Sequence, residues 1–287
     1  MQLTNRPFEQ SIGRRDLTHW RTPVGRLLAR AVMRASRWTT WRWLSIVLTL
    51  GGAMVVGSAA YAAAAVYESV EDGRDGFGPW DRPLLTWSVD HRPADVARAI
   101  TWFTAIGGPV VTPVVAVVVL AVMTWRWRTP TPAVLGLLAG VGSLAITIAG
   151  KAAVGRDRPP LAEAVPPYEH SFSFPSGHAT NAVVVAGIIA YLLLTRATRA
   201  STRAVIVTVA VLYALGIGAS RVYLGHHWAS DVMAGWAIGA AWLAMVITGH
   251  RLHLTHHRYH AEIAAGEDPP ALEPRSGDGE SGIRPVG

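Results

Sequence analysis

The sequence predicts an all-α membrane protein, a polytopic bundle of six transmembrane helices. Of its 287 residues, 51% are hydrophobic and 16% are charged. Six long segments contain neither a charged residue nor a histidine, and a helix of roughly 20 apolar residues crosses the hydrocarbon core of a bilayer. No alternation of polar and apolar residues accompanies these segments, so helices rather than a closed barrel are expected to satisfy the backbone in lipid.

These six segments are the candidate spans. In chain order they are Trp43–Tyr67, Ala99–Trp125, Thr129–Gly150, Ala179–Thr195, Ala204–Ser220 and Val232–Gly249. The second segment is longer than one span, and Gly107, Gly108 and Pro109 within it favour a helix break. We therefore expect an interfacial helix over Ala94–Ile106 and a span over Pro109–Trp125.

The arginines between the spans predict the orientation of the bundle. Residues 1–42 contain nine arginines and two acidic residues, and further arginines follow the second, fourth and sixth spans. Because loops rich in Lys and Arg stay on the cytoplasmic side, both termini are expected in the cytoplasm of a multi-pass cell-membrane protein. Segment 68–98, with seven acidic residues and four arginines, is then expected outside.

We divide the chain into three parts. Residues 1–42 are a basic cytoplasmic N-terminal tail that has room for a short amphipathic helix, and residues 43–250 are the six-helix membrane domain. Residues 251–287 are a cytoplasmic C-terminal tail that is largely disordered. Its histidine-rich start, within "HRLHLTHHRYH", favours an interfacial basic helix, and residues 261–287, rich in Gly, Pro, Ser and acidic residues, are expected to be disordered. The net charge of +7 fits basic cytoplasmic segments rather than a nucleic-acid binder.

Three polar clusters interrupt the apolar pattern at span ends, at residues 151–160, 171–180 and 220–231. If the first span runs outward, the order of the spans places all three clusters at the outer face and at a similar depth. Ionisable residues at such positions are costly to keep near lipid and are therefore candidates for function. We predict one site at the outer end of the last four helices.

The first two clusters supply groups that suit an anion. The stretch "KAAVGRDRPP" contains Lys151, the only lysine in the chain, and Arg158; alone, this pair could be interfacial side chains that reach the headgroups. In "SFSFPSGHAT", Ser176 and Gly177 lead into a helix whose free N–H groups favour an anion, and His178 falls in its first turn. Alone, this stretch could be a capped helix start.

The third cluster, "SRVYLGHHWASD", adds a candidate nucleophile. Arg221 offers a planar set of donors that matches phosphate oxygens. His227 and Asp231 are four residues apart, so the carboxylate can accept from one imidazole nitrogen and leave the other as a base or nucleophile. His226 falls one residue off this spacing, and we interpret it as a neighbour of the site.

Together these side chains are typical of phosphoryl transfer, in which catalysis is mostly positioning and electrostatics. Cations would hold the phosphate, His227 backed by Asp231 would be the nucleophile, and His178 is available as an acid. A metal site would need clustered carboxylates or several ligands on one face, and Asp231, Asp157 and Glu163 do not form such a cluster in the sequence. No metal and no cofactor are expected.

The three clusters resemble the motifs of the type-2 phosphatidic acid phosphatase superfamily, which shares its site with vanadium-dependent haloperoxidases. The eleven matching positions are Lys151, Arg158, Pro159, Pro175, Ser176, Gly177, His178, Ser220, Arg221, His227 and Asp231. The resemblance covers about residues 80–250, and no motif position departs from the pattern. It implies that His227 attacks phosphorus to form a phosphohistidine, that Asp231 orients it, and that His178 protonates the leaving oxygen. The phosphate would be held by Lys151, Arg158, Ser176, Gly177 and Arg221.

The resemblance implies a metal-independent phosphatase that hydrolyses a lipid phosphate or prenyl diphosphate at the outer membrane face. Candidate substrates are prenyl diphosphates such as undecaprenyl diphosphate, phosphatidic acid and phosphatidylglycerol phosphate. The expected partners are this lipid and the membrane, with no nucleic acid. One alternative is a vanadate-dependent haloperoxidase, disfavoured because those enzymes are soluble. Another is a non-catalytic lipid-phosphate transporter or scaffold, disfavoured by the intact nucleophile, acid and orienting carboxylate.

Overall fold

The computed structural model describes residues 10–13, 15–35 and 78–265. A short antiparallel hairpin is formed by β1 (Ser11–Ile12) and β2 (Arg15–Asp16). The helices are α1 (Pro23–Ala35), α3 (Gly78–Asp90), α4 (Ala94–Ile106), α5 (Val111–Trp127), α6 (Thr131–Val154), α7 (Gly177–Leu194), α8 (Ala200–Tyr223) and α9 (Ala229–Ala264), with a short 3₁₀ turn η2 (Leu161–Glu163). The protein is therefore mostly helical, as predicted.

Four helices, α6 to α9, are each long and apolar enough to cross a membrane, and α4 with α5 forms a further candidate span bent by 44°. The break between α4 and α5 follows Ile106, where Gly107 and Gly108 had predicted it. A Cβ atom on Gly107 would lie 2.6 Å from Cγ2 of Ile217 in α8, so this close approach requires glycine. The first predicted span, Trp43–Tyr67, lies outside the described residues, and the count of six spans stays a prediction.

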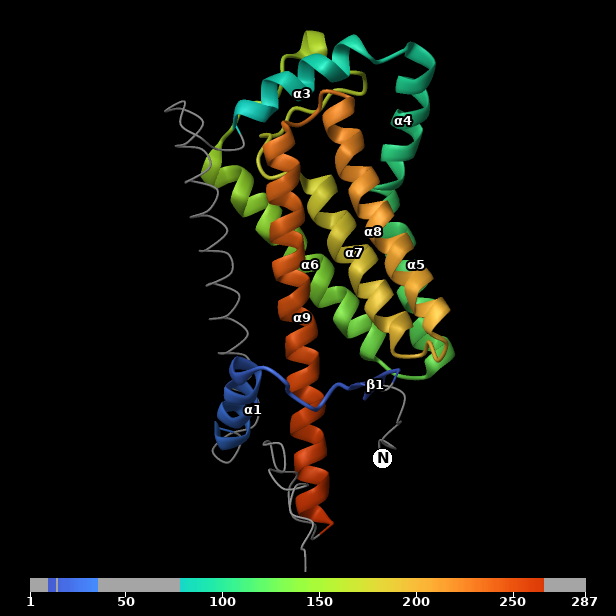
Figure 1. The fold of residues 1–287 in the computed structure, drawn as a ribbon, viewed down its shortest axis with the longest axis vertical. Coiled ribbons are helices and arrows are strands. Elements are labelled where there is room, and N and C mark those ends of the chain that lie inside the picture. The colour runs from blue at the N-terminus through green and yellow to red at the C-terminus, as the bar shows by residue number, and fades with distance from the viewer. Residues whose placement is uncertain (1–9, 14, 36–77, 266–287) are drawn as a thin grey trace, which may run out of the picture.

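Helix α7 forms the centre of the bundle, with α6, α8 and α9 packed around it (Figure 1). Its buried apolar side chains join a core with α5, α6 and α9. The contact with α9 is close because α9 presents glycines: a Cβ atom would lie 2.8 Å from the carbonyl oxygen of Ser176 at Gly235, and 2.8 Å from that of Thr180 at Gly239. Small residues four apart let two helix backbones approach in this way. The glycines therefore bring the N-terminal ends of α7 and α9 together.

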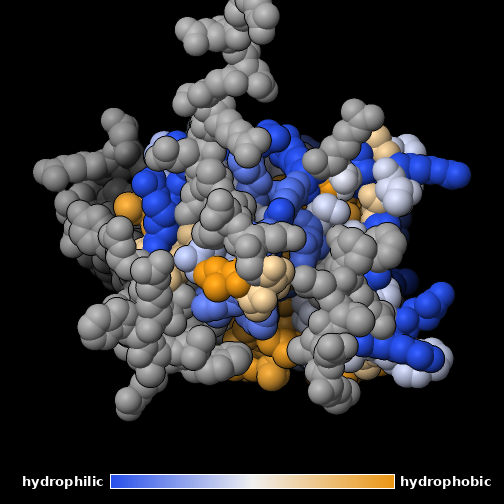
Figure 2. All heavy atoms as spheres, turned by 90° about the horizontal axis from the view of Figure 1, so that it is seen from below, coloured by the Kyte–Doolittle hydropathy of each residue, from blue (hydrophilic) through white to orange (hydrophobic). Residues whose placement is uncertain are grey.

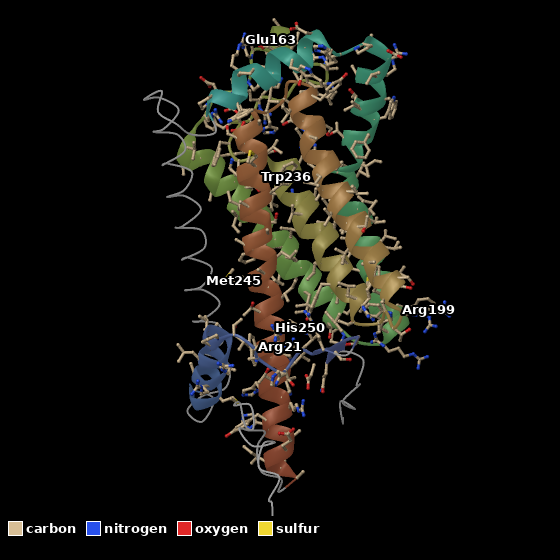
Figure 3. The ribbon with its side chains drawn as sticks, in the orientation of Figure 1. Arg21, Glu163, Arg199, Trp236, Met245 and His250 are labelled. Atoms are coloured by element: carbon tan, nitrogen blue, oxygen red, sulfur yellow. The ribbon has the colours of Figure 1, made fainter. Side chains whose placement is uncertain are left out.

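The short helices α3 and α4 cover one end of the bundle (Figure 1). α4 lies along the upper part of α8, where the hydroxyl of Ser220 donates to Oγ1 of Thr104 at 2.8 Å. α3 crosses the ends of α8 and α9, and its Asp81 accepts from the backbone N–H of Ser230 at 2.8 Å. This end also carries the loop of Glu163, whereas Arg199 lies at the other end of the bundle (Figure 3).

Helix α9 corrects the boundary that we predicted at residue 250. It continues to Ala264 as one helix, so the stretch after residue 250, for which we expected a separate interfacial helix, extends the last span, and residues 261–264 are helical rather than disordered. Neither glycine nor proline occurs between His250 and Ala264 to end the helix. The predicted basic tail of the N-terminus contributes α1, and Trp20 just before it donates to Thr255 of α9 at 3.1 Å. Hydrophilic side chains gather on this end of the molecule (Figure 2).

Candidate active site

The three polar clusters of the sequence meet at the end of the bundle that α3 and α4 cover (Figure 1). Two hydrogen bonds join their loops: Ser176 N–H donates to the carbonyl of Asp231 at 3.1 Å, and Val165 N–H donates to that of Leu224 at 2.9 Å. Gly225 has a φ of 71°, and a Cβ atom there would lie 2.5 Å from the carbonyl oxygen of Glu163. Only glycine allows this turn to lie against the loop before α7.

His227 is buried against Asp231 and faces Arg158. Its Nδ1 lies 3.5 Å from Oδ2 of Asp231, and its Nε2 lies 3.2 Å from Nη1 of Arg158. Because a guanidinium can only donate, Nε2 presents its lone pair toward Arg158, and Nδ1 carries the proton. Burial lowers the pKa of His227 to about 4, although Asp231 opposes this shift. The imidazole is therefore neutral at pH 7, as a nucleophile must be.

Asp231 is held on both of its oxygens. Oδ2 accepts from the hydroxyl of Ser173 at 2.5 Å and from the backbone N–H of Trp228 at 3.0 Å. Oδ1 accepts from Arg156 at 2.7 Å. The side chain has no exposed surface. A carboxylate fixed in this way orients the imidazole beside it.

An anion cup, which we define as Arg158, Arg221 and His178, lies beside His227. The carboxylate of Glu169 occupies it. Glu169 forms ion pairs with Arg158 at 2.8 Å and with Arg221, and its Oε1 lies 3.9 Å from Nδ1 of His178. Burial raises the pKa of Glu169, but nearby positive groups, Arg221 first, outweigh burial and lower the pKa to about 2. A charged carboxylate therefore sits between the two predicted phosphate-binding arginines.

The remaining predicted phosphate-binding residues lie close by, with their side chains engaged elsewhere. The ammonium of Lys151 donates to the carbonyl of Phe172. The hydroxyl of Ser176 caps α7, accepting from Ala179 N–H at 3.5 Å, and the residue is fully buried. Gly177 is the first residue of α7. The structure thus brings Arg158, Arg221, His178 and His227 around one point. Lys151, in the last turn of α6, and Ser176, at the start of α7, bond to nearby backbone groups instead.

His226 faces away from the anion cup. Its Nε2 lies 2.6 Å from the carbonyl oxygen of Val165, in the loop before α7. Burial, followed by the charge of Arg221, lowers the pKa of His226 to about 4. Its backbone carbonyl accepts from Arg158 at 2.6 Å. His226 therefore contacts the loop that surrounds the site, and only its backbone contacts an arginine of the cup.

Sequence reasoning missed a charged network behind Asp231. Arg156 donates to Asp231 at 2.7 Å, to Asp81 of α3 at 2.8 Å and to the hydroxyl of Ser230 at 2.7 Å. Asp81 is 4% exposed and also accepts from Ser230 Oγ at 2.6 Å. Arg156 stood beside a motif position, and Asp81 stood in segment 68–98, which we expected outside and did not assign to the site. The only sequence signal was an acid within the apolar stretch "PWDRPLL".

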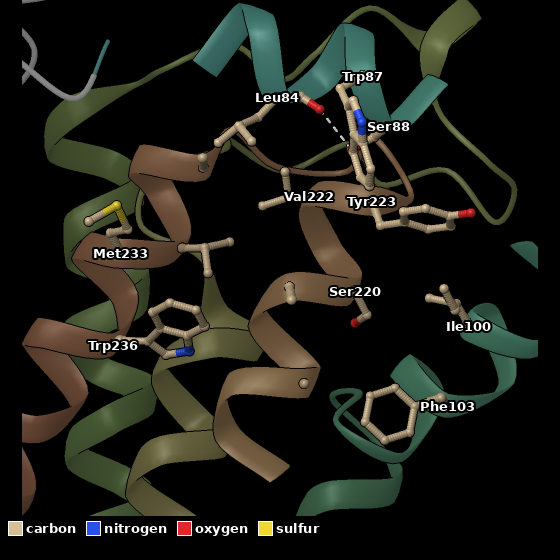
Figure 4. A pocket seen from close by; sticks show the side chains of 14 residues that line it. Leu84, Trp87, Ser88, Ile100, Phe103, Ser220, Val222, Tyr223, Met233 and Trp236 are labelled. Atoms are coloured by element: carbon tan, nitrogen blue, oxygen red, sulfur yellow. Dashed lines mark hydrogen bonds between the residues drawn. The ribbon is translucent and has the colours of Figure 1, made fainter. Parts of the chain in front are cut away.

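An apolar groove with a volume of about 550 Å³ lies beside the anion cup. Its walls come from α3, α4, α8 and α9, represented by Trp87, Phe103, Tyr223 and Trp236 (Figure 4). Ser220, which precedes Arg221 of the cup, also lines it. Among the described residues, no group of three or more His, Cys, Asp or Glu side chains could hold a metal ion.

Comparisons with known proteins find similarity in both sequence and fold. Phosphatidylglycerophosphatase B of Bacillus subtilis (strain 168) is 41% identical over 87 residues, which span 30% of this chain and 42% of that protein. The crystal structure of a transmembrane PAP2-type phosphatidylglycerolphosphate phosphatase from Bacillus subtilis is similar with a TM-score of 0.57 and 27% identity, covering 70% of this chain and 92% of that one. Residues 130–253, which hold all three motif clusters, match the model of the PAP2 superfamily, so this part of the chain is similar to that superfamily. The candidate spans and the likeness to a transmembrane structure support a multi-pass membrane protein.

Proposed function

We propose that this protein is a membrane-embedded phosphatase that removes a terminal phosphate from a lipid. The observation that carries the proposal is the position of His227, whose Nε2 lone pair faces Arg158 while Asp231 lies behind Nδ1. A nucleophile, an orienting carboxylate and two cations are thus arranged around a single anion-binding point. This set supports phosphoryl transfer, because its charges match those of the transferring group.

The proposed reaction has two steps. Nε2 of His227 attacks phosphorus, the P–O bond to the lipid breaks, and His178 gives a proton to the leaving oxygen. Water then gives a proton to His178 and attacks the phosphohistidine, the P–N bond breaks, and inorganic phosphate leaves with both histidines regenerated. Arg158 and Arg221 hold the phosphate oxygens in both steps, and Asp231 stabilises the imidazole as positive charge develops on it. Lys151, Ser176 and Gly177 are proposed to complete the phosphate site.

Two observations support the substrate class that we propose: the names of the similar proteins and the apolar groove. The two similar Bacillus proteins are described as phosphatases of phosphatidylglycerol phosphate, so we propose this lipid phosphate first and a prenyl diphosphate second. The apolar groove between α3, α4, α8 and α9 offers a surface for a hydrocarbon tail while the phosphate lies in the anion cup. The position of the site at one end of the candidate spans supports binding of the phosphate at the membrane interface.

The orientation of this site is testable on a chain without native cysteine. The arginine bias supports a site that faces outward with both termini in the cytoplasm. Ala162 lies exposed in the loop at the site end, and Ala200 lies exposed at the opposite end. We expect Ala162→Cys to react with an impermeant thiol reagent in intact cells and Ala200→Cys to react only after permeabilisation. The reverse pattern would invert the topology.

The function is tested by phosphate release from a panel of lipid phosphates in detergent. We expect release by the wild-type protein in the presence of EDTA, and inhibition by vanadate, which mimics five-coordinate phosphorus. Activity that chelation abolishes and magnesium restores would contradict the metal-independent mechanism. Halide oxidation on addition of vanadate, without phosphate release, would instead favour the haloperoxidase alternative.

A further inference from the structure

Glu169 belongs to none of the three motifs, yet its carboxylate lies where a phosphate would bind. All three members of the anion cup face it: Arg158 at 2.8 Å, Arg221 in a direct ion pair, and His178 at 3.9 Å. The proposed function requires these same side chains for the substrate phosphate. Glu169 and a bound phosphate therefore exclude each other from the cup.

The walls of the cup are fixed more firmly than its occupant. The side chain of Arg221 is 3% exposed and that of Arg158 is 11% exposed, whereas that of Glu169 is 30% exposed. Arg158 is also anchored to the carbonyls of Ser171 and His226, both at 2.6 Å. If Glu169 turned outward, the two arginines would stay in place. They would then be one buried and one partly buried cation without this counter-ion, a costly state that another anion would relieve.

We propose that Glu169 is a specificity-determining residue: its carboxylate occupies the anion cup in the resting enzyme, and a substrate enters only by displacing it. This inference rests on the proposed phosphatase function, because it assigns the cup to a substrate phosphate. Glu169 then sets a threshold of charge for entry. A lipid with a terminal phosphate passes the threshold, and a lipid whose phosphate is a diester does not.

The charges explain the selection. A phosphodiester headgroup carries one negative charge, the same as the carboxylate it must displace, so the exchange gains little. A terminal phosphate carries about −1.5 to −2 at pH 7 and three acceptor oxygens, so it interacts more strongly with both arginines. Glu169 also competes as part of the same chain, at a high effective concentration. Discrimination by an element that penalises the wrong ligand is a general route to specificity.

The test compares Glu169→Gln with Glu163→Gln. Both variants remove a carboxylate from the loop between α6 and α7, but Glu163 pairs with the exposed Arg82, outside the cup. In detergent, the inhibition constant of inorganic phosphate should fall about tenfold or more in Glu169→Gln, as expected if the carboxylate occupies the cup at least nine-tenths of the time. In Glu163→Gln it should stay at the wild-type value. A diester lipid, phosphatidylglycerol, added to the micelles should inhibit Glu169→Gln and leave wild type and Glu163→Gln unaffected.

A second measurement does not depend on turnover. In buffer without phosphate, Glu169→Gln should have a lower Tm than wild type, because Arg158 and Arg221 lose this counter-ion. Inorganic phosphate should raise the Tm of this variant more than that of wild type or Glu163→Gln, because a ligand stabilises the state that binds it. A merely structural role for Glu169 would lower Tm without this recovery by phosphate.

The outcomes separate this inference from the proposed function. Equal phosphate affinity in wild type and Glu169→Gln, by inhibition and by Tm, would overturn the role of Glu169 while leaving the phosphatase intact. Loss of activity in Glu169→Gln with unchanged phosphate affinity would also overturn it. If wild type releases phosphate from no lipid, the proposed function fails, and a phosphate-dependent Tm gain confined to Glu169→Gln would still support the displacement of Glu169 by an anion.

Discussion

The two ends of the bundle both contain arginines and histidines, but these side chains have different partners. At the site end, the buried Arg221 and the partly buried Arg156 pair with carboxylates, and His227 lies between Asp231 and an arginine. At the opposite end, Arg251 lies over the ring of Trp20 at 4.2 Å and donates to backbone carbonyls.

The histidines differ in the same way. Near the opposite end, His250 lies 2.8 Å from the hydroxyl of Tyr191, and His253 and His257 contact each other with ring centroids 4.4 Å apart. No carboxylate is paired with these three histidines in the described part of the chain. A histidine or an arginine thus becomes a candidate for catalysis when it has a buried carboxylate partner. The number of histidines and arginines, which is higher at the opposite end, does not decide this.

The largest expected effect is the loss of the nucleophile. His227→Ala should lower phosphate release by about 10³-fold or more, because it removes the imidazole that lies between Asp231 and Arg158. His226→Ala, on the same loop, and His250→Ala, near the opposite end of the bundle, should each keep most of the activity. The measurement is the initial rate of phosphate release from a lipid phosphate in detergent. Activity retained by His227→Ala and abolished by His226→Ala would reverse the assignment of the loop.

A smaller effect is expected when the nucleophile stays and its orientation is lost. Asp231→Asn should lower kcat by about 10²-fold, by analogy with the loss of an orienting carboxylate in a catalytic triad. The amide oxygen can still accept from Ser173 and Trp228, and Arg156 keeps its ion pair with Asp81. The fold should therefore survive, with a Tm below wild type because the ion pair between Arg156 and Asp231 is lost. The matched change at the opposite end is Asp16→Asn, which removes an ion pair to Arg258. It should leave kcat unchanged, and an equal loss in both variants would remove the distinction between the two ends.

A still smaller loss of activity is expected when the hydrogen-bond network behind Asp231 is weakened. Asp81→Asn weakens the hold of α3 on Arg156, and Arg156 in turn fixes Oδ1 of Asp231. We expect kcat to fall about tenfold with KM little changed, as is typical when a partner of a site residue is altered. A change in KM alone would show that Asp81 acts on substrate entry through α3 rather than on the orientation of Asp231.

These predictions also mark what the sequence could reveal. The break after Ile106 and the approach of the three clusters to one end followed from local signals, such as the paired glycines and the alternation of spans across the membrane. Glu169, Asp81 and Arg156 did not, because their partners are distant in the chain. Arg221 is 52 residues from Glu169, and Asp231 is 75 residues from Arg156. No pattern within a single segment encodes such pairs, which exist only once the helices have packed.

The length of α9 shows the same limit in the other direction. The first ionisable residues after the last apolar segment predicted the end of a membrane span at residue 250. A helix can continue beyond the lipid, however, where contacts with other segments stabilise it. The contacts of Trp20 and Arg251 near the start of α1 supply that support. They join two segments 235 residues apart. Because the sequence of either segment does not show this contact, both were assigned to tails.

The smallest effect is expected at the apolar groove, where the comparison becomes one between two positions on a single helix. Ala219 of α8 lines the groove at the site end, and Ala204 is exposed on the same helix near the opposite end. Ala219→Phe places a ring in the groove and should raise KM for a long-chain lipid phosphate by about fivefold, the equivalent of ~1 kcal/mol. It should leave kcat unchanged, because the ring does not reach His227, and it should leave KM for a short-chain, water-soluble phosphate unchanged, because that substrate has no tail to place. Ala204→Phe adds the same ring to α8 and should change neither parameter. If Ala219→Phe raised KM equally for the short and long substrates, the groove would affect the anion cup itself rather than the tail, and the proposed path of the hydrocarbon chain would be wrong.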